Sequence, residues 1–228
     1  RYMALQLPFD YDHFSTLLLD AARNAFLRLQ RERAGETFYL FALHASEDFA
    51  NFCIVADTEE ALDRLTHAQY QKYRHSWYDG LSFSELRQVL RYGAGEYFCP
   101  DAYRPLFDEV NAVASRRSRQ LYEAQQQLTS EGGADYAQEA LLPYRRAMIS
   151  VCLRVLKQLE AEGIFGPRER RYEVLVTFLS GMIYHEAYLQ YALDLNAPQV
   201  VERFLGELVA AADVSQIIQE NMWRHAQM

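Results

Sequence analysis

The sequence contains no long uncharged apolar segment, and it has only three cysteines and ten glycines in 228 residues. No stretch approaches the roughly 18–20 apolar residues that a membrane-spanning helix needs. Three cysteines are too few for a disulfide scaffold. Because 50% of the residues are hydrophobic and 24% are charged, a disordered or collagen-like chain is excluded. We expect one soluble globular domain over residues 1–228, with no membrane partner.

Basic residues are outnumbered by acidic ones, and the net charge is -8. A protein that binds a nucleic-acid backbone needs a basic stripe, so nucleic acid is not expected as a partner. A negative surface attracts and steers cationic molecules. The excess of acidic residues favours a basic protein as the partner. The alternative is that the acidity only keeps the chain soluble.

The three cysteines, Cys53, Cys99 and Cys152, share no C-x-x-C spacing. Their odd number and apolar neighbours predict reduced thiols in a core. The six histidines form no H-x-x-x-H pair and no short spacing with cysteine, so we expect no metal. The turn at Gly93-Ala94-Gly95 matches only the start of a dinucleotide-binding fingerprint. No cofactor is therefore expected.

The first residues carry no apolar segment of the kind found in secretory signals. The cytoplasm is the expected location. A signal that has been removed remains the alternative, since the sequence does not begin with methionine.

The order of apolar patterns predicts an α+β fold. Apolar residues at three- and four-residue steps predict amphipathic helices, whereas short runs of apolar and aromatic residues predict strands. The helices are expected over 11–33, 58–74, 83–90, 106–128, 136–162 and 198–208, with a helical tail over 209–228. The strands are expected over 37–43, 51–56 and 172–179. We expect a small, mostly antiparallel sheet, made of an N-terminal hairpin plus a late central strand, with helices packed on it.

Two local features are candidates for partner binding. The first is the loop His75-Ser76-Trp77-Tyr78-Asp79-Gly80, where two aromatic residues stand between titratable ones, a composition enriched at binding hot spots. The alternative is that Trp77 folds back onto the core. The second is an acidic patch near the hairpin that consists of Glu47, Asp48, Asp57, Glu59, Glu60 and Asp63, and the last four of these are the expected docking residues. A solvated helix start is the alternative there.

A catalytic site has weaker support in the sequence. No G-x-S-x-G elbow is present, and no cysteine has a base close to it in the sequence. A cluster of His75, Asp79, His185 and Glu186, brought together by folding, is the only basis for an enzyme such as a hydrolase or nucleotide-acting protein. We therefore expect no catalytic residues and hold the enzyme as the alternative.

Several ordered motifs resemble the bacterial domain of unknown function 4303 family. They are Phe38–Leu43, Asn51–Val55, Thr58–Leu62, Tyr73–Trp77, Phe107–Asn111, Leu159–Gly166 and Leu193–Pro198. The resemblance spans residues 10–208. Departures occur at His75, where the family often has tryptophan, and over 180–185, where an acidic run is often found.

The resemblance implies a small intracellular bacterial protein, and some members of the family are suspected immunity proteins encoded beside polymorphic toxins. No catalytic residues come with it. We expect a cytoplasmic immunity protein that binds a cognate basic toxin domain and occludes its active site. Its contacts are expected from Asp57, Glu59, Glu60, Asp63, His75, Trp77, Tyr78 and Asp79. A regulatory or scaffold module with another ligand is a third interpretation.

Overall fold

The N-terminal third of the chain forms a helix followed by a β-hairpin. The computed structural model describes residues 8–93, 97–132, 134–181 and 188–227. Helix α1 (Tyr11–Glu32) begins after Asp10, whose side chain accepts a hydrogen bond from the His13 amide. Strands β1 (Phe38–Ala45) and β2 (Phe52–Thr58) pair antiparallel. The expected helix and hairpin are both confirmed.

The middle of the chain is helical. Its elements are α2 (Glu59–Tyr73), α3 (Phe83–Leu90), the two-residue strand β3 (Tyr97–Phe98), the 3₁₀ helix η1 (Asp101–Phe107), α4 (Asp108–Gly132) and α5 (Ala134–Ala161). Thr58 caps α2, because its hydroxyl accepts a hydrogen bond from the Ala61 amide. Helix α4 extends past residue 128 to Gly132, further than the sequence predicted.

The last part of the chain returns to the sheet and then leaves it in a long helix. It contains the 3₁₀ helix η2 (Arg168–Glu173), strand β4 (Leu175–Ser180), the short α7 (Ala192–Leu195) and α8 (Pro198–Ala226). The expected strand over 172–179 therefore begins at Leu175, because η2 precedes it. The predicted tail over 209–228 continues α8 as far as Ala226.

The sheet has four strands in the order β3-β2-β1-β4. The α+β class is confirmed, but β4 is an edge strand that pairs parallel to β1, where a central strand was expected. Its burial explains the error. Five of its six residues are buried, because helices cover both faces, and such a strand reads as a continuous apolar run.

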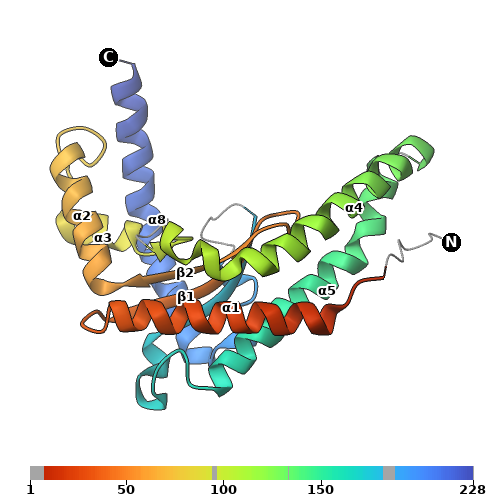
Figure 1. The fold of residues 1–228 in the computed structure, drawn as a ribbon. Coiled ribbons are helices and arrows are strands. Elements are labelled where there is room, and N and C mark those ends of the chain that lie inside the picture. Colours follow the sequence, from red (N-terminus) through yellow and green to blue (C-terminus); the bar gives the residue numbers. More distant parts are fainter. Residues whose placement is uncertain (1–7, 94–96, 133, 182–187, 228) are drawn as a thin grey trace.

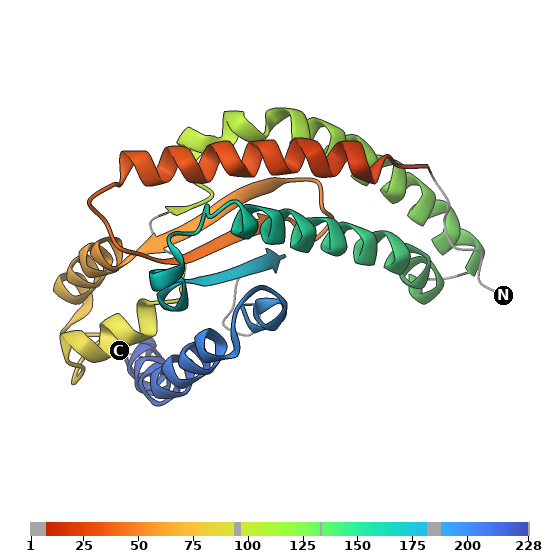
Figure 2. The ribbon, with the colours of Figure 1, turned by 90° about the horizontal axis from the view of Figure 1, so that it is seen from below.

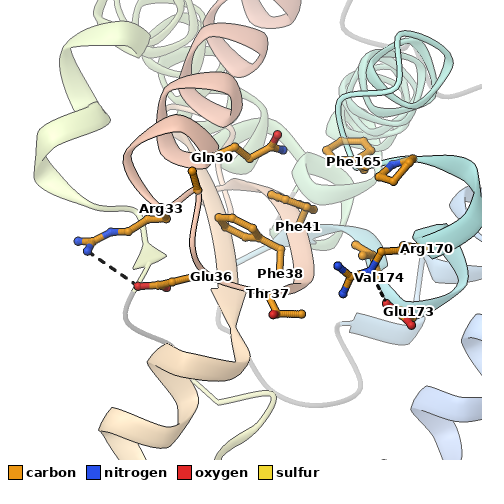
Figure 3. Close-up of a pocket in the computed structure, with 13 residues that line it drawn as sticks. Gln30, Arg33, Glu36, Thr37, Phe38, Phe41, Phe165, Arg170, Glu173 and Val174 are labelled. Atoms are coloured by element: carbon orange, nitrogen blue, oxygen red, sulfur yellow. Dashed lines mark hydrogen bonds and ion pairs between the residues drawn. The ribbon is translucent and has the colours of Figure 1, made fainter.

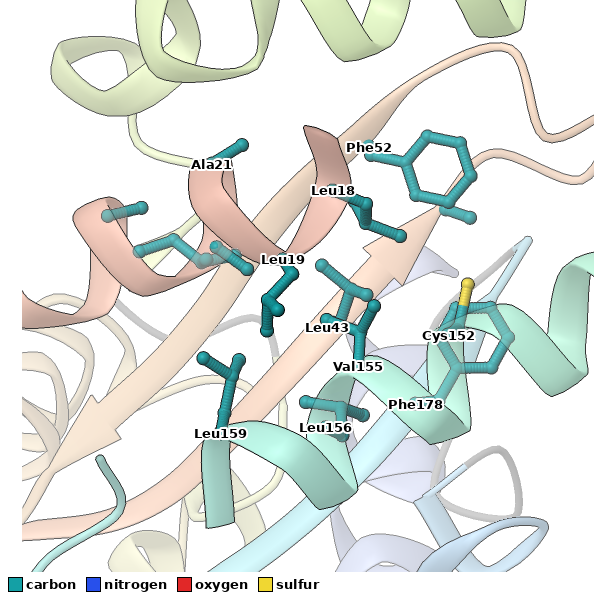
Figure 4. Close-up of a cluster of buried hydrophobic side chains, with 14 of the residues drawn as sticks. Leu18, Leu19, Ala21, Leu43, Phe52, Cys152, Val155, Leu156, Leu159 and Phe178 are labelled. Carbon is teal, nitrogen blue, oxygen red and sulfur yellow. The ribbon is translucent and has the colours of Figure 1, made fainter. Parts of the chain in front are cut away.

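Helices cover the sheet on two sides, as Figure 2 shows for α1 on one side and α8 on the other. Side chains of α1 and α5 meet those of the strands in the larger apolar cluster, where Leu18, Leu43 and Val155 lie together (Figure 4). On the opposite face, Leu40, Val55 and Phe204 belong to a second cluster. A third and smaller cluster joins α3 to α8.

The cysteines differ from the expectation of three reduced thiols. Cys53 and Cys99 are joined by a disulfide across 46 residues, with their Cα atoms 5.2 Å apart. Cys152 is a free thiol buried in the core as predicted, and burial raises its pKa. No spacing in the sequence indicates this pair, because a hairpin and the short β3 bring the two residues together.

Candidate functional site

The predicted partner-binding residues lie at two ends of α2. Glu59, Glu60 and Asp63 are in its first turns, whereas the loop over 75–80 follows its last turn. A helix rises about 1.5 Å per residue, so the two groups are separated by roughly 20 Å along the helix axis. The structure does not bring them together into one site.

Asp57 and Glu60 contact neighbouring parts of the chain. Asp57 is only 2% exposed and accepts hydrogen bonds from the Tyr39 hydroxyl and the Thr58 amide. Glu60 accepts hydrogen bonds from the amide and the hydroxyl of Thr37. Asp57 is therefore absent from the exposed surface, and Glu60 joins the start of α2 to Thr37, the residue before β1.

Glu59 forms ion pairs with Arg87 of α3 and with Arg91, the residue after α3. Asp63 pairs with Arg87. Arg91 binds Glu59 through two nitrogens at 2.6 and 2.8 Å. Arg87 bridges Glu59 and Asp63 at 2.6 and 2.5 Å. Burial acts to raise the pKa of Glu59, but the hydrogen bonds from Arg91 and Arg87 outweigh it, and the pKa lies below its ordinary value.

These ion pairs change the interpretation of the acidic patch. Arg64, the nearest cation in the sequence, binds Glu36 of the loop before β1, whereas Arg87 and Arg91 come from 24 or more residues away. The four-residue spacing of these two arginines on the predicted helix is the sequence signal for them, since such residues share a helix face. Much of the patch charge is therefore neutralised within the chain.

The aromatic loop packs back onto α2. The Trp77 ring stacks on Tyr73 with centroids 4.2 Å apart, and Tyr78 meets the same ring edge-on and is 8% exposed. His75 and Asp79 are exposed. The structure therefore agrees with the alternative in which Trp77 folds back onto the core. Tyr78 is not part of the exposed surface.

Asn221 of α8 holds this loop in place. Its side-chain nitrogen donates to the carbonyl oxygens of Trp77 and Asp79 at 3.2 and 2.9 Å. The side chain is buried, so the contact is shielded from water. The loop and the C-terminal half of α8 consequently form one continuous side of the molecule, beside α2 and α3 (Figure 1).

The outer face of α8 carries exposed apolar residues that the sequence analysis did not single out. Val209 is 72% exposed, Trp223 is 68% exposed, and Leu205 is also exposed. Because a helix turns once in about 3.6 residues, positions 205, 209 and 223 face the same side. We call these three residues the apolar stripe. The sequence indicates the stripe through this spacing, because it places the three residues on a different helix face from the buried residues Phe204, Ala211 and Val214.

Three carboxylates run along one side of the apolar stripe. Glu202, Asp213 and Glu220 are all exposed, and their spacings of eleven and seven residues are close to three and two turns. None of them forms an ion pair within the part of the chain that the structure describes. We call them the acidic flank. Unlike Glu59 and Asp63, they leave negative charge available to another molecule.

A small aromatic pocket with a volume of about 220 Å³ lies at the start of β1, at the end of the hairpin opposite its turn. Phe38 and Phe41 stack at 4.9 Å on one wall, near Phe165 (Figure 3). At the rim, Arg170 pairs with Glu173 at 2.9 Å. Because these rim charges are paired, the pocket suits a small apolar group, and its lining offers no nucleophile next to a base.

The residues proposed for catalysis are not gathered by the structure. His75 and Asp79 lie in the exposed loop after α2. His185 and Glu186 lie outside the described residues, so the proposed cluster stays a prediction. Within the described chain, one set of side chains has donor atoms placed to hold a metal ion together: His44, Cys53 and Cys99, on the β1–β2 hairpin and after β3.

Comparison with known proteins identifies the family. Residues 18–197 match the family described as "Domain of unknown function (DUF4303)". The chain belongs to the DUF4303 family. No curated protein and no solved structure matches it.

The DUF4303 match lies within the 10–208 span of the recognised motifs and covers the chain from α1 to α7. It stops at residue 197, just before α8 begins at Pro198. The apolar stripe and acidic flank therefore lie outside the matched region. None of the described helices has the length and apolar character needed to cross a membrane.

Proposed function

We propose that this DUF4303 protein is a non-catalytic binding protein that docks a basic protein domain on the outer face of α8. The observation that carries this proposal is the exposure of Trp223, in line with Leu205 and Val209. Exposed apolar residues that share one helix face and are rimmed by polar or charged residues mark interaction sites. Tryptophan is also the residue type most enriched among binding hot spots.

Trp223 is a better anchor than the two aromatic residues expected from the sequence. One face of the Trp77 ring is already stacked on Tyr73, and Tyr78 is buried. Trp223 makes no ring contact within the described residues. Its surface therefore remains available to a partner.

The charge around the apolar stripe favours a basic partner. Glu202, Asp213 and Glu220 lie within one turn of Leu205, Val209 and Trp223, respectively, as i+3 and i+4 neighbours do. A rim of unpaired charge accelerates association with an oppositely charged protein and suppresses wrong partners. The chain's net charge of -8 adds to this attraction.

The finer proposal is that the partner is a cognate bacterial toxin domain, that its active site is occluded, and that the encounter takes place in the cytoplasm. It is supported by the resemblance of the motifs to a family with suspected immunity proteins and by the acidic balance of the chain. Membership of DUF4303 supplies no activity, and α8 lies outside the matched region. The finer proposal therefore needs a test of its own.

The test uses the purified protein encoded beside this gene, with affinity measured by calorimetry. Alanine at a hot-spot tryptophan costs about 2 kcal/mol or more, so Trp223→Ala should weaken binding roughly 30-fold or more. Tyr122→Ala is the matched control, because Tyr122 is an aromatic residue of α4 that is 61% exposed. Its removal should leave the affinity unchanged.

Two further outcomes separate the parts of the proposal. Light scattering of the chain alone should show a monomer, because a dimer that Trp223→Ala dissociates would make a second copy the occupant of α8. The partner expressed alone should arrest growth, and this chain should relieve the arrest. A partner that binds through Trp223 without any toxicity would overturn immunity and leave the binding surface standing.

A further inference from the structure

Three side chains with metal-binding donor atoms converge on one face of the sheet. His44 and Cys53 are directly opposite each other in the β1–β2 ladder, and Cys99 follows β3, where its amide donates to the Ile54 carbonyl at 3.0 Å. The His44 Nδ1 atom lies 3.6 Å from the Cys53 Sγ and 3.8 Å from the Cys99 Sγ. All three donor atoms lie within 4.8 Å of one another.

The hydrogen bonding of His44 leaves its Nδ1 atom facing the two sulfurs without a proton. The Nε2 atom lies 3.0 Å from the Gly181 carbonyl oxygen. A carbonyl only accepts hydrogen bonds, so Nε2 carries the hydrogen and Nδ1 keeps its lone pair. This arrangement is the one that metal-binding histidines adopt, with the second ring nitrogen donating to a backbone carbonyl.

The neutral imidazole is the form in which histidine binds a metal. The three side chains are half-buried, so an ion reaches them without the sheet opening.

The backbone at Cys99 is held in an unusual conformation. Its φ is +43°, and among the described residues Phe49 is the only other non-glycine residue with a positive φ. Such a conformation is unfavourable for a residue other than glycine and is found where the surroundings impose it, often at functional sites. Here it accompanies a side chain that lies beside His44 and Cys53.

We propose that Cys53, Cys99 and His44 form a zinc site when the two cysteines are reduced. Tetrahedral zinc, with bonds of about 2.3 Å to sulfur and 2.0–2.1 Å to nitrogen, separates those donors by about 3.5 Å. The distances of 3.6 and 3.8 Å between Nδ1 and the sulfurs are close to this separation. Three protein ligands leave the fourth position of the ion to water.

The disulfide and the zinc site are alternative states of the same cysteines. A thiol reductant supplies two electrons and two protons, becomes a disulfide itself, and leaves Cys53 and Cys99 as two thiols. Binding of Zn²⁺ then displaces those two protons and forms two zinc–sulfur bonds. Oxidation of the pair removes both sulfur ligands. The site therefore holds zinc only in a reducing environment, where thiols persist.

The experiment titrates zinc into the full chain after reduction with a phosphine and removal of metal. We expect one zinc per chain, release of about two protons as seen from the buffer dependence of the heat, and a thiolate-to-metal charge-transfer band with Co²⁺. The oxidised chain, which needs no substitution, should bind neither ion. Circular dichroism checks that both forms are folded.

Variants then assign the ligands. Cys53→Ser, Cys99→Ser and His44→Gln should each weaken zinc binding by roughly 100-fold or more, beyond the 10–100-fold typical of losing a supporting outer group. Cys152→Ala keeps the site, because Cys152 is buried in the core on α5. A folded, reduced wild-type chain that binds no zinc overturns the proposal. So does zinc binding that survives both Cys53→Ser and Cys99→Ser.

Discussion

Asn196 binds both backbone groups of Val176 on the edge of β4 that faces away from β1. Its Oδ1 atom accepts from the Val176 amide at 2.9 Å, and its Nδ2 atom donates to the Val176 carbonyl at 2.6 Å. The side chain thus makes the hydrogen bonds that another strand would make. An edge strand is otherwise a template for unwanted pairing, so Asn196 closes this side of the sheet.

Asn111 makes the same contact on β2. Its Oδ1 accepts from the Phe52 amide at 2.7 Å, and its Nδ2 donates to the Phe52 carbonyl at 3.2 Å. Phe52 lies beyond the reach of β3, which pairs only with Val55 and Ala56. Both asparagines belong to motifs through which the chain resembles its family, and the structure gives each a structural role.

We predict that Asn196→Ala and Asn111→Ala each lower the free energy of unfolding by about 1–3 kcal/mol, because each leaves a buried amide and carbonyl unpaired. Urea unfolding monitored by circular dichroism measures the change. Asn51→Ala is the control, since the Asn51 side chain is exposed and makes no hydrogen bond within the described residues. If Asn196→Ala and Asn111→Ala lower the free energy of unfolding no more than Asn51→Ala does, the structural role of the two asparagines is refuted.

Glu59 should make stability depend on pH in the acidic range. Its folded pKa lies below the ordinary value of 4.5, so its ion pairs stabilise the fold above about pH 4.5 and are lost as the pH falls through the folded value. We expect Glu59→Gln to destabilise the chain at pH 7 and the difference to shrink below pH 4.5. Urea unfolding of both chains at pH 7 and at pH 4 measures the two differences, and a difference that does not shrink at the lower pH would contradict the role of the ion pairs.

Two glycines should respond oppositely to alanine. Gly163 ends α5 with φ of +75°, whereas Gly206 lies inside α8 at an ordinary helical φ, and an added Cβ meets nothing within 4 Å at either position. Gly163→Ala should cost about 1 kcal/mol from the left-handed backbone. Gly206→Ala should add about 0.5–1 kcal/mol through helix propensity. Thermal unfolding of both variants tests this, and shifts of the same sign would contradict it.

The two tryptophans should report different environments in the free chain. Trp77 and Trp223 are the only tryptophans, and Trp223 is 68% exposed whereas Trp77 is stacked on Tyr73. In single-tryptophan variants, Trp77→Phe leaves an emission at longer wavelength that acrylamide quenches strongly. Trp223→Phe leaves a bluer emission that is quenched less. Equal quenching of the two would show that Trp223 is covered.

Much of the fold follows from local patterns. The periodicity of α1 and the hairpin depend on residues that are close together in the chain, so the sequence predicts them. The place of β4 depends on a parallel pairing with β1 across more than 130 residues. Its apolar sequence shows that it is buried and carries no information about which neighbour it pairs with.

The candidate site was harder to predict for the same reason. The acidic patch is visible in the sequence, but Arg87 and Arg91 neutralise it from another helix. His44, Cys53 and Cys99 meet only because the β1–β2 register and β3 bring them together, and their spacing matches no metal motif. The exposure of Trp223 depends on which face of α8 packs on α3, which periodicity alone does not decide.

The most direct test of the binding surface is acrylamide quenching of Trp223 in the Trp77→Phe chain, with and without the purified partner. If the partner docks on α8, quenching of Trp223 should fall several-fold in the complex and recover when Asp213→Asn and Glu220→Gln weaken the association at moderate salt. A complex that forms at full affinity and leaves the quenching of Trp223 unchanged would contradict the account.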